Sequence, residues 1–323
     1  MAVHAFIFPG QGSQTVGMGR DLAAAFPAAR EVFQEVDEVL KQHLSTIMFQ
    51  GPAETLTLTE NAQPALMAVS LAVLRVLERE GGFVLEDKAA LVLGHSLGEY
   101  SALAAAGSLG LADAARLLRR RGAAMQAAVP AGEGAMAALL GADLEQARGL
   151  CEAAAVLRHE DGREEQQVVE PANDNGGGQV VISGALAAVE RAVAMAKERG
   201  IKRAMLLPVS APFHCALMAP AADVMRDALG EAAVRAPVVP LVANVTAERT
   251  VDPAEIRDLL VRQVTGLVRW RESMLAAVAM GVDSFVELGA GKVLAGLARR
   301  IDPEVAAVSA GMPAEIETVL KGL

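Results

Sequence analysis

A serine between two glycines is the residue best suited to chemistry in this sequence. The apolar segment Ala89–Leu93 leads into Gly94-His95-Ser96-Leu97-Gly98, and the helix-forming segment Ser101–Ala106 follows. A sharp turn from a strand into a helix lifts a serine hydroxyl clear of its backbone and brings free N–H groups of the helix N-terminus beside it. The pattern predicts a nucleophile for acyl chemistry at Ser96. The alternative is a tight turn in which Ser96 only caps a helix.

A serine nucleophile requires a base, and the sequence holds five histidines. His214 lies in a loop, Ala211-Pro212-Phe213-His214-Cys215, just after a predicted strand at 204–208, and proline restricts the backbone there. His95 adjoins Ser96, but neighbouring side chains diverge at so sharp a turn, so we expect His95 to make a structural hydrogen bond. The sequence therefore predicts His214 as the base, since the serine needs a partner.

Glycines also follow the first predicted strand, 4–8, in the loop Pro9-Gly10-Gln11-Gly12. Thr15 stands where the dinucleotide-binding fingerprint requires its third glycine, and no Lys-Ser/Thr pair closes a phosphate-binding loop. The loop is predicted to turn tightly and to present backbone N–H groups. Donation to an oxyanion fits these residues better than phosphate binding.

Composition excludes several classes of function. The formal net charge of −10 argues against general nucleic-acid binding, which needs a basic face. No apolar run approaches the roughly 18 residues of a membrane span, and the first residues resemble a strand rather than a signal peptide. The two cysteines, Cys151 and Cys215, form neither a disulfide framework nor a metal-binding spacing. We expect a cytoplasmic monomer with no metal or bound cofactor, in which Cys215 is an inert buried thiol.

Alternating strand and helix patterns predict a parallel sheet covered by helices. The expected helices cover 21–41, 62–80, 97–106, 111–128, 256–263 and 272–280, and the expected strands cover 4–8, 89–93, 236–243 and 284–288. The strand-to-helix serine turn is the feature that organises such a sheet in α/β hydrolases.

The pattern changes after Pro130. Strands at 135–140, 179–183 and 204–208 alternate with helices at 143–155 and 185–199, an order that resembles a ferredoxin-like unit. The charged stretch 159–167 is predicted to be a solvated loop. We therefore expect an α/β protein with a large α/β-hydrolase-like domain, residues 1–130 and 204–323, and a small inserted ferredoxin-like α+β domain, residues 131–203.

Taken together, the motifs resemble those of the malonyl-CoA:acyl-carrier-protein transacylases of type II fatty acid synthesis, over nearly the whole chain. The similar segments are Phe8-Pro9-Gly10-Gln11-Gly12-Ser13-Gln14, Gly94-His95-Ser96-Leu97-Gly98-Glu99, Arg121-Gly122-Ala123-Ala124-Met125-Gln126, Ala172-Asn173-Asp174-Asn175, His214-Cys215-Ala216-Leu217-Met218 and Gly289-Ala290-Gly291-Lys292-Val293-Leu294. Two departures stand out. Ala290 replaces the family's usual proline, and the stretch 159–167 is longer than is usual.

The resemblance implies a role for each matching residue. Ser96 would be the nucleophile and His214 the base, oriented by the backbone carbonyl of Gln263 rather than by an aspartate. The backbone N–H groups of Gln11 and Leu97 would form the oxyanion hole.

The resemblance also implies how substrate is held. Arg121 would grip the free carboxylate of a malonyl group through two parallel hydrogen bonds. Met125, Phe213 and Asn173 would line the pocket, and Phe213 is often associated with malonyl over methylmalonyl selectivity in related polyketide domains. For docking of an acidic carrier protein we expect a local basic face, with Lys202, Arg203 and Lys292 as candidates and solvated surface charge as the alternative.

The implied activity is transfer of malonyl from malonyl-CoA to the phosphopantetheine thiol of holo acyl carrier protein, through a malonyl-serine intermediate. Coenzyme A enters as the substrate thioester. The alternatives are a discrete acyltransferase serving a polyketide synthase in trans, an α/β-hydrolase thioesterase, and a catalytically inactive binding module. The hydrolase fits poorly, because its histidine lies near the C-terminus, after an acidic residue, and here 109 residues follow His214.

Overall fold

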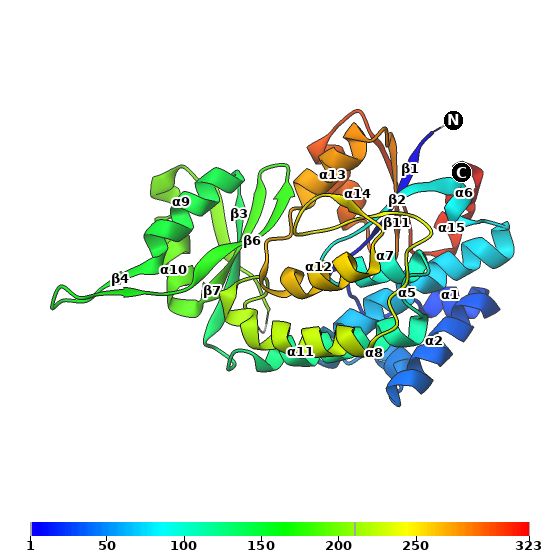
Figure 1. Cartoon of the computed structure of the whole chain (residues 1–323), viewed down its shortest axis with the longest axis horizontal. Helices are drawn as coiled ribbons and strands as arrows, with labels where there is room; N and C mark the ends of the chain where they lie inside the picture. Colours follow the sequence, from blue (N-terminus) through cyan, green and yellow to red (C-terminus); the bar gives the residue numbers. More distant parts are fainter. Residues whose placement is uncertain (1, 210, 323) are drawn as a thin grey trace.

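The computed structural model describes residues 2–209 and 211–322. Two main sheets lie side by side along the long axis of the molecule, each with its own helices (Figure 1). The larger sheet takes up both ends of the sequence, and the smaller one takes up its middle.

The larger sheet has the strand order β10-β9-β2-β1-β11-β12, and every neighbouring pair is parallel except β9–β10. Its strands are β1 (His4–Phe8), β2 (Ala89–Gly94), β9 (Leu241–Val242), β10 (Arg249–Thr250), β11 (Ser284–Leu288) and β12 (Ala306–Ala310). A parallel sheet of this kind is buried on both faces, which accounts for the nearly unbroken apolar runs of β1 and β2.

Helices cover both faces of this sheet. They are α1 (Arg20–Ala25), α2 (Pro27–Leu40), α3 (Leu44–Gln50), α4 (Ala53–Thr57), α5 (Thr59–Gly81), α6 (Leu85–Lys88), α7 (Gly98–Ala105), α8 (Leu111–Ala127), α11 (Ala219–Glu231), α12 (Pro253–Thr265), α13 (Trp270–Ala279), α14 (Val293–Ile301) and α15 (Pro313–Gly322). Side chains alternate along β1, so Phe6 and Phe8 pack with α2, α5 and α8 on one face. Ala5 and Ile7 pack with α13 and α14 on the other.

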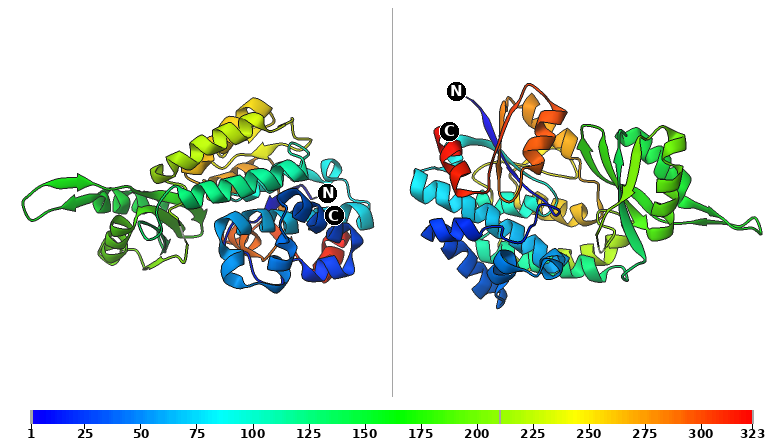
Figure 2. Two further views of the ribbon diagram at one scale, coloured as in Figure 1. Left: turned by 90° about the horizontal axis from the view of Figure 1, so that it is seen from below. Right: turned by 180° about the vertical axis from the view of Figure 1, so that it is seen from behind.

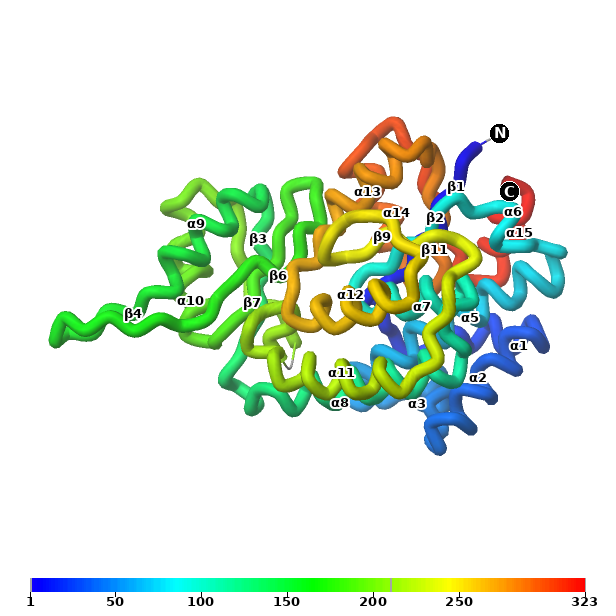
Figure 3. Tube along the Cα trace, viewed as in Figure 1, coloured from blue at the N-terminus to red at the C-terminus, as the bar shows by residue number. Residues whose placement is uncertain are grey.

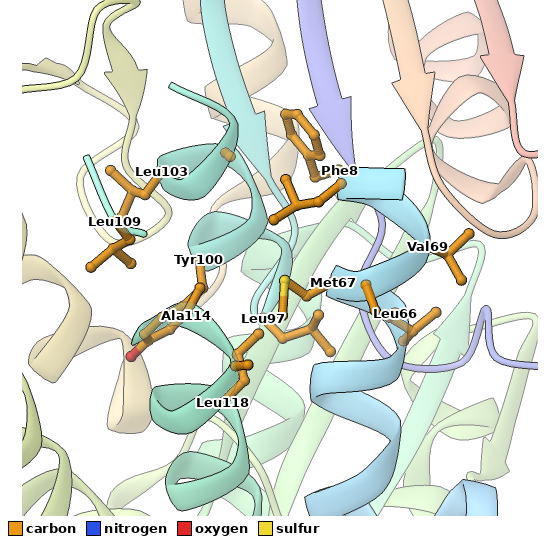
Figure 4. Close-up of a cluster of buried hydrophobic side chains, with 14 of the residues drawn as sticks. Phe8, Leu66, Met67, Val69, Leu97, Tyr100, Leu103, Leu109, Ala114 and Leu118 are labelled. Atoms are coloured by element: carbon orange, nitrogen blue, oxygen red, sulfur yellow. The ribbon is translucent and has the colours of Figure 1, made fainter. Parts of the chain in front are cut away.

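The core beneath the serine turn joins three helices. Leu97 and Tyr100 pack beside Leu118 of α8 and beside Leu66 and Met67 of α5 (Figure 4). The helix that follows Ser96 is therefore fixed by buried apolar contacts, which gives the serine a rigid support.

The smaller sheet is antiparallel, with the order β6-β7-β3-β8. Its strands are β3 (Gly134–Leu140), β6 (Val169–Gly176), β7 (Gln179–Ala185) and β8 (Arg203–Leu206), and its helices are α9 (Leu144–Ala155), α10 (Leu186–Met195) and the 3-10 turn η1 (Lys197–Arg199). The helices pack on one core with Ala137, Leu139 and Ile182.

A hairpin extends from this part of the molecule into solvent. Its strands, β4 (Val156–Arg158) and β5 (Glu164–Gln166), pair only with each other, and Figure 3 shows them pointing away from the larger sheet. The solvated loop expected at 159–167 is therefore wrong in part: the segment is exposed, but its end at 164–166 pairs as a strand.

Covalent and non-covalent connections hold the two parts together. Helix α8 runs out to β3, and the chain returns through a loop and the 3-10 turn η2 (Ala216–Met218) into α11, which lies alongside α8 (Figure 2). Among the non-covalent connections, the N–H of Val268 donates to Ala172 O, and the N–H of Asp174 donates to Val268 O, each at 2.9 Å.

Several expected elements differ from those observed. The helix expected at 21–41 is two helices, because Phe26 is extended before Pro27. The strand expected at 236–243 pairs only at Leu241–Val242, after Pro237 and Pro240, which lack the N–H that pairing needs. The smaller sheet has a fourth strand, β6, that the pattern did not predict.

Within the described ranges, every helix is too short or too polar to cross a bilayer.

Candidate active site

Ser96 occupies the turn between β2 and α7 and has a positive φ of 54°. Two glycines make the turn possible. A Cβ on Gly94 would lie 1.9 Å from the carbonyl carbon of Gly98, and a Cβ on Gly98 would lie 2.2 Å from Phe8 O. The turn is therefore packed directly on itself and on β1, and Ser96 is held in a strained backbone conformation typical of nucleophiles at such turns.

His214 reaches Ser96 from the loop between β8 and η2. Its Nε2 lies 2.7 Å from Ser96 Oγ, and its Nδ1 lies 2.8 Å from the backbone carbonyl oxygen of Gln263. A carbonyl can only accept, so Nδ1 carries the proton and Nε2 accepts from the serine hydroxyl. The structure thus brings Ser96 and His214 into contact and places the imidazole against the backbone carbonyl of Gln263.

The protonation state of His214 follows from its surroundings. Burial lowers the pKa of His214 to about 3, and the positive charge of Arg121 adds to the shift, while the hydrogen bond to Gln263 opposes it. The imidazole is therefore neutral near neutral pH and able to take a proton.

Arg121 lies on α8 and is 1% exposed. Its Nη1 donates to Gln63 Oε1 at 2.9 Å, and its Nη2 donates to Gln263 Oε1 at 2.8 Å and to Ser96 Oγ at 3.2 Å. Burial lowers the pKa of Arg121, but an arginine remains ionised in a protein. The structure thus brings a buried cation into contact with the serine, as predicted.

The depth of Arg121 depends on its neighbour in the sequence. A Cβ on Gly122 would lie 2.6 Å from the Cα of Glu60 and from the carbonyl oxygen of Thr59. Glycine therefore lets α8 approach the start of α5 closely. On its other side, the guanidinium lies 5.7 Å from the ring centroid of Tyr100.

The loop of Gln11 packs against the serine turn. A Cβ on Gly10 would lie 2.7 Å from His95 O, so no side chain fits between the two segments. In the described residues, no hydrogen bond uses the backbone N–H of Gln11 or of Leu97. Both N–H groups are thus available as donors, in line with the prediction for an oxyanion hole.

The residues predicted to line the pocket, and His95, lie on several different elements around Ser96. Met125 is buried beside Gln63, with 3.7 Å between its Sδ and Gln63 Nε2, and Phe213 is buried next to His214. Asn173 is buried in β6, bridged to Val268. His95 hydrogen-bonds Asn175 Oδ1 at 2.8 Å, which confirms the structural hydrogen bond expected of it.

The predicted docking residues are exposed. Lys202 precedes β8 and Arg203 is its first residue, at the edge of the smaller sheet. Lys292 lies at the start of α14, and its Nζ pairs with Glu315 Oε1 at 2.5 Å.

The two thiols are buried. Burial raises the pKa of Cys215 to about 11 and that of Cys151 to about 12. Neither thiol is activated. The described residues also contain no group of three or more His, Cys, Asp or Glu side chains able to hold a metal ion.

Sequence reasoning missed three polar residues of the site: Gln63, Glu99 and Asn244. Asn244 Oδ1 accepts the backbone N–H of Ser96 at 2.8 Å, and its Nδ2 donates to Gly94 O at 2.7 Å, so it braces the turn. Glu99 is part of the serine motif, which is a signal that could have identified it. Gln63 and Asn244 carry no local signal, because only the folded chain brings them to Ser96.

Comparisons with known proteins agree with this geometry. A family model described as an acyl transferase domain matches residues 5–305. The malonyl CoA-acyl carrier protein transacylase of Escherichia coli (strain K12) is 46% identical over 321 residues, covering 99% of this chain and all of the relative.

Solved structures of related proteins resemble this chain in both sequence and fold. The acyl-carrier-protein-S-malonyltransferase of Bartonella henselae is 56% identical, with a TM-score of 0.93 and 99% of each chain covered. A malonyl-transacylase solved in complex with a holo type II polyketide synthase acyl-carrier protein is 42% identical, with a TM-score of 0.93 and full coverage of both chains. This chain belongs to the acyl transferase family and, within it, to the malonyl CoA-acyl carrier protein transacylases.

Proposed function

We propose that this chain transfers a malonyl group from malonyl-CoA to the phosphopantetheine thiol of holo acyl carrier protein and so supplies fatty acid chain elongation. The observation that carries this proposal is the contact of three groups: the hydroxyl of Ser96, the imidazole of His214 and the guanidinium of Arg121. A nucleophile, a neutral base and a buried cation suit an acyl group that ends in a carboxylate.

In the first half-reaction, Ser96 Oγ attacks the thioester carbonyl and its proton passes to His214 Nε2. The N–H groups of Gln11 and Leu97 donate to the resulting oxyanion, while Arg121 holds the malonyl carboxylate. When the C–S bond breaks, the imidazolium returns the proton to the leaving sulfur. Coenzyme A departs as the thiol, and malonyl remains on Ser96.

In the second half-reaction, the carrier thiol attacks the malonyl-serine ester and gives its proton to His214. Collapse of the oxyanion breaks the bond to Ser96 Oγ, which regains the proton. Malonyl leaves on the carrier sulfur. Transfer must outpace hydrolysis, which is consistent with the burial of Arg121 and His214.

Intact mass spectrometry of both proteins, after mixing with malonyl-CoA and holo acyl carrier protein, tests this proposal. We expect a malonyl adduct first on this chain and then on the carrier, and no adduct on either protein with Ser96→Ala. Free malonate with an unmodified carrier would instead indicate a thioesterase, and unchanged masses an inactive binder.

A discrete acyltransferase serving a polyketide synthase is the second candidate. It is favoured by the similarity to a malonyl-transacylase solved with a type II polyketide synthase carrier protein. Competition between a fatty acid carrier and a polyketide carrier, with both malonyl products weighed in one reaction, distinguishes the two. The thioesterase reading is weaker, because a carbonyl rather than a carboxylate contacts Nδ1 of His214.

We further propose that residues 1–130 and 204–323 form an α/β-hydrolase-like domain and that residues 131–203 form a ferredoxin-like domain. The order β3-α9-β6-β7-α10-β8 supports the second assignment. The proposed boundary at 203 falls within β8, and β8 pairs with β3 of the smaller sheet. Native-state hydrogen exchange should show residues 131–203 protected and released as one unit.

We also propose a cytoplasmic monomer that uses coenzyme A only as the substrate thioester and holds no other cofactor. Two buried free thiols support a reducing compartment. Sedimentation and native mass measured on the purified chain test the oligomeric state and any bound group. The basic residues Lys202, Arg203 and Lys292 are proposed to dock the carrier.

A further inference from the structure

Glu99 is a buried carboxylate that the reaction steps above do not use. It lies in the first turn of α7, three residues after Ser96, and is 1% exposed. We infer that Glu99 is a positioning residue that acts on Arg121 through the side-chain amide of Gln263, and that the charge of Glu99 lowers the preference for acyl groups with a free carboxylate. This inference rests on the proposed malonyl transfer.

The contacts of Gln263 fix the orientation of its amide. Its Nε2 donates to Glu99 Oε2 at 2.6 Å and to the backbone carbonyl of Ser96 at 2.9 Å. If the amide were turned over, its oxygen would face two oxygen atoms that accept hydrogen bonds. Its N–H groups would face the guanidinium of Arg121, which can only donate. Glu99 therefore helps to keep Gln263 Oε1 facing Arg121 Nη2, at 2.8 Å.

The same amide stands between two opposite charges. In the described residues, Glu99 and Arg121 form no direct ion pair, and the amide of Gln263 bridges them with its N–H toward the carboxylate and its oxygen toward the guanidinium. A malonyl carboxylate at Arg121 would place a second negative charge near Glu99. The two carboxylates would then compete for one cation, and the charge of Glu99 would weaken the hold on malonyl.

The surroundings of Glu99 bring its pKa into the neutral range. Burial raises the pKa of Glu99 to about 7, while hydrogen bonds from Gln263 and Asn244 and the charge of Arg121 oppose the rise. The other titratable groups nearby are Tyr100 on α7, whose pKa is also raised by burial, and His214, which is neutral above about pH 3. Glu99 is thus the group around Arg121 that changes charge near neutral pH.

Glu99 also accepts the backbone N–H of Asn244, at 3.3 Å, and Asn244 in turn holds the N–H of Ser96. If the role of Glu99 were purely structural, replacing Glu99 would therefore disturb Ser96 and lower the transfer of every acyl group alike. A role in positioning Arg121 would alter malonyl transfer and leave acetyl transfer much less affected. The ratio of malonyl transfer to acetyl transfer therefore distinguishes the two roles.

The test measures kcat/KM for malonyl-CoA and for acetyl-CoA between about pH 5.5 and 8.5, because the ratio cancels any effect of pH on the steps that both substrates share. In the wild type, the malonyl-to-acetyl ratio should fall about tenfold as pH rises and Glu99 becomes charged. Glu99→Gln keeps the shape and an acceptor oxygen but cannot ionise. Its ratio should stay at the low-pH value throughout.

Glu287→Gln is the matched control. Glu287 is another buried glutamate with a raised pKa, but it lies in β11 and accepts the N–H groups of Leu294 and Ala295. This variant should retain the pH dependence of the wild-type ratio.

Three outcomes would overturn the inference: a wild-type ratio that does not change with pH, a Glu99→Gln ratio that follows the wild type, or equal losses for both substrates. The first can be measured even if Glu99→Gln does not fold. Failure of the proposed function differs from all three, because the wild type would then transfer no malonyl to the carrier.

Discussion

His214 and Gln263 are joined by a hydrogen bond in which Nδ1 of the imidazole donates to the backbone carbonyl, over 2.8 Å. The side chain of the same glutamine accepts from Arg121. One residue thus serves the base with its main chain and the cation with its side chain. Because substitution removes only the side chain, the two roles can be separated by experiment.

Gln263→Ala should retain the tautomer of His214 and lose the support of Arg121. We expect malonyl transfer to fall on the order of 10- to 100-fold, from the loss of a hydrogen bond to a charged group, and acetyl transfer to fall much less. Thermal unfolding should also show destabilisation, since Glu99 loses a donor. Equal losses of kcat/KM for malonyl-CoA and acetyl-CoA would contradict this division of roles.

Arg121→Met should reduce malonyl transfer on the order of 10² to 10⁴-fold, because two charge-assisted hydrogen bonds to the substrate are lost. Acetyl transfer should persist, because acetyl has no carboxylate to hold. The control is Arg120→Met: Arg120 is the preceding residue, and its Nη1 pairs with Glu231 at the surface. A parallel decline in both acyl transfers would instead make Arg121 a structural residue.

The pH dependence of Arg121→Met offers a second check. Burial and then the charge of Arg121 hold the pKa of His214 at about 3, below its ordinary value of 6.5. Removing the cation should raise the pKa of His214, so the imidazole becomes protonated at a higher pH. The acid limb of acetyl-CoA kcat/KM should therefore move to higher pH in the variant. An unmoved or lowered limb would show that Arg121 does not act on His214.

Carrier docking is tested by the double variant Lys202→Glu with Arg203→Glu. Reversing two exposed charges should weaken turnover with an acidic carrier several-fold and more strongly at low salt, and leave transfer to free pantetheine intact. Arg20→Glu with Lys321→Glu makes the same charge change on helices α1 and α15 and serves as the control. If both double variants match the wild type with carrier protein, the docking face lies elsewhere.

The sequence predicted the parts of the site that have local signatures. Gly94 and Gly98 are required by steric contacts within the turn, so their spacing identified Ser96. His214 could be inferred because a serine needs a base. Arg121 was distinguished from Arg119 and Arg120 only by its resemblance to a family motif, since all three arginines suit a helix surface equally well.

The rest depends on contacts between distant segments. Asn244 reaches Ser96 across 148 positions and Gln63 reaches Arg121 across 58, and no local pattern encodes either contact. The hairpin β4–β5 was missed for a related reason. Its strands are only three residues long, and β5 is polar and exposed throughout, so neither strand shows the alternation that marks a strand.

The close crossing of α5 and α8 at Gly122 helps to determine how far Arg121 reaches, because no side chain fits between the two helices there. A bulkier residue at 122 would push this stretch of α8 outward and change the length of diacid that fits between cation and nucleophile. Engineering toward longer dicarboxylic acyl units can therefore begin at a contact that the acyl group never touches.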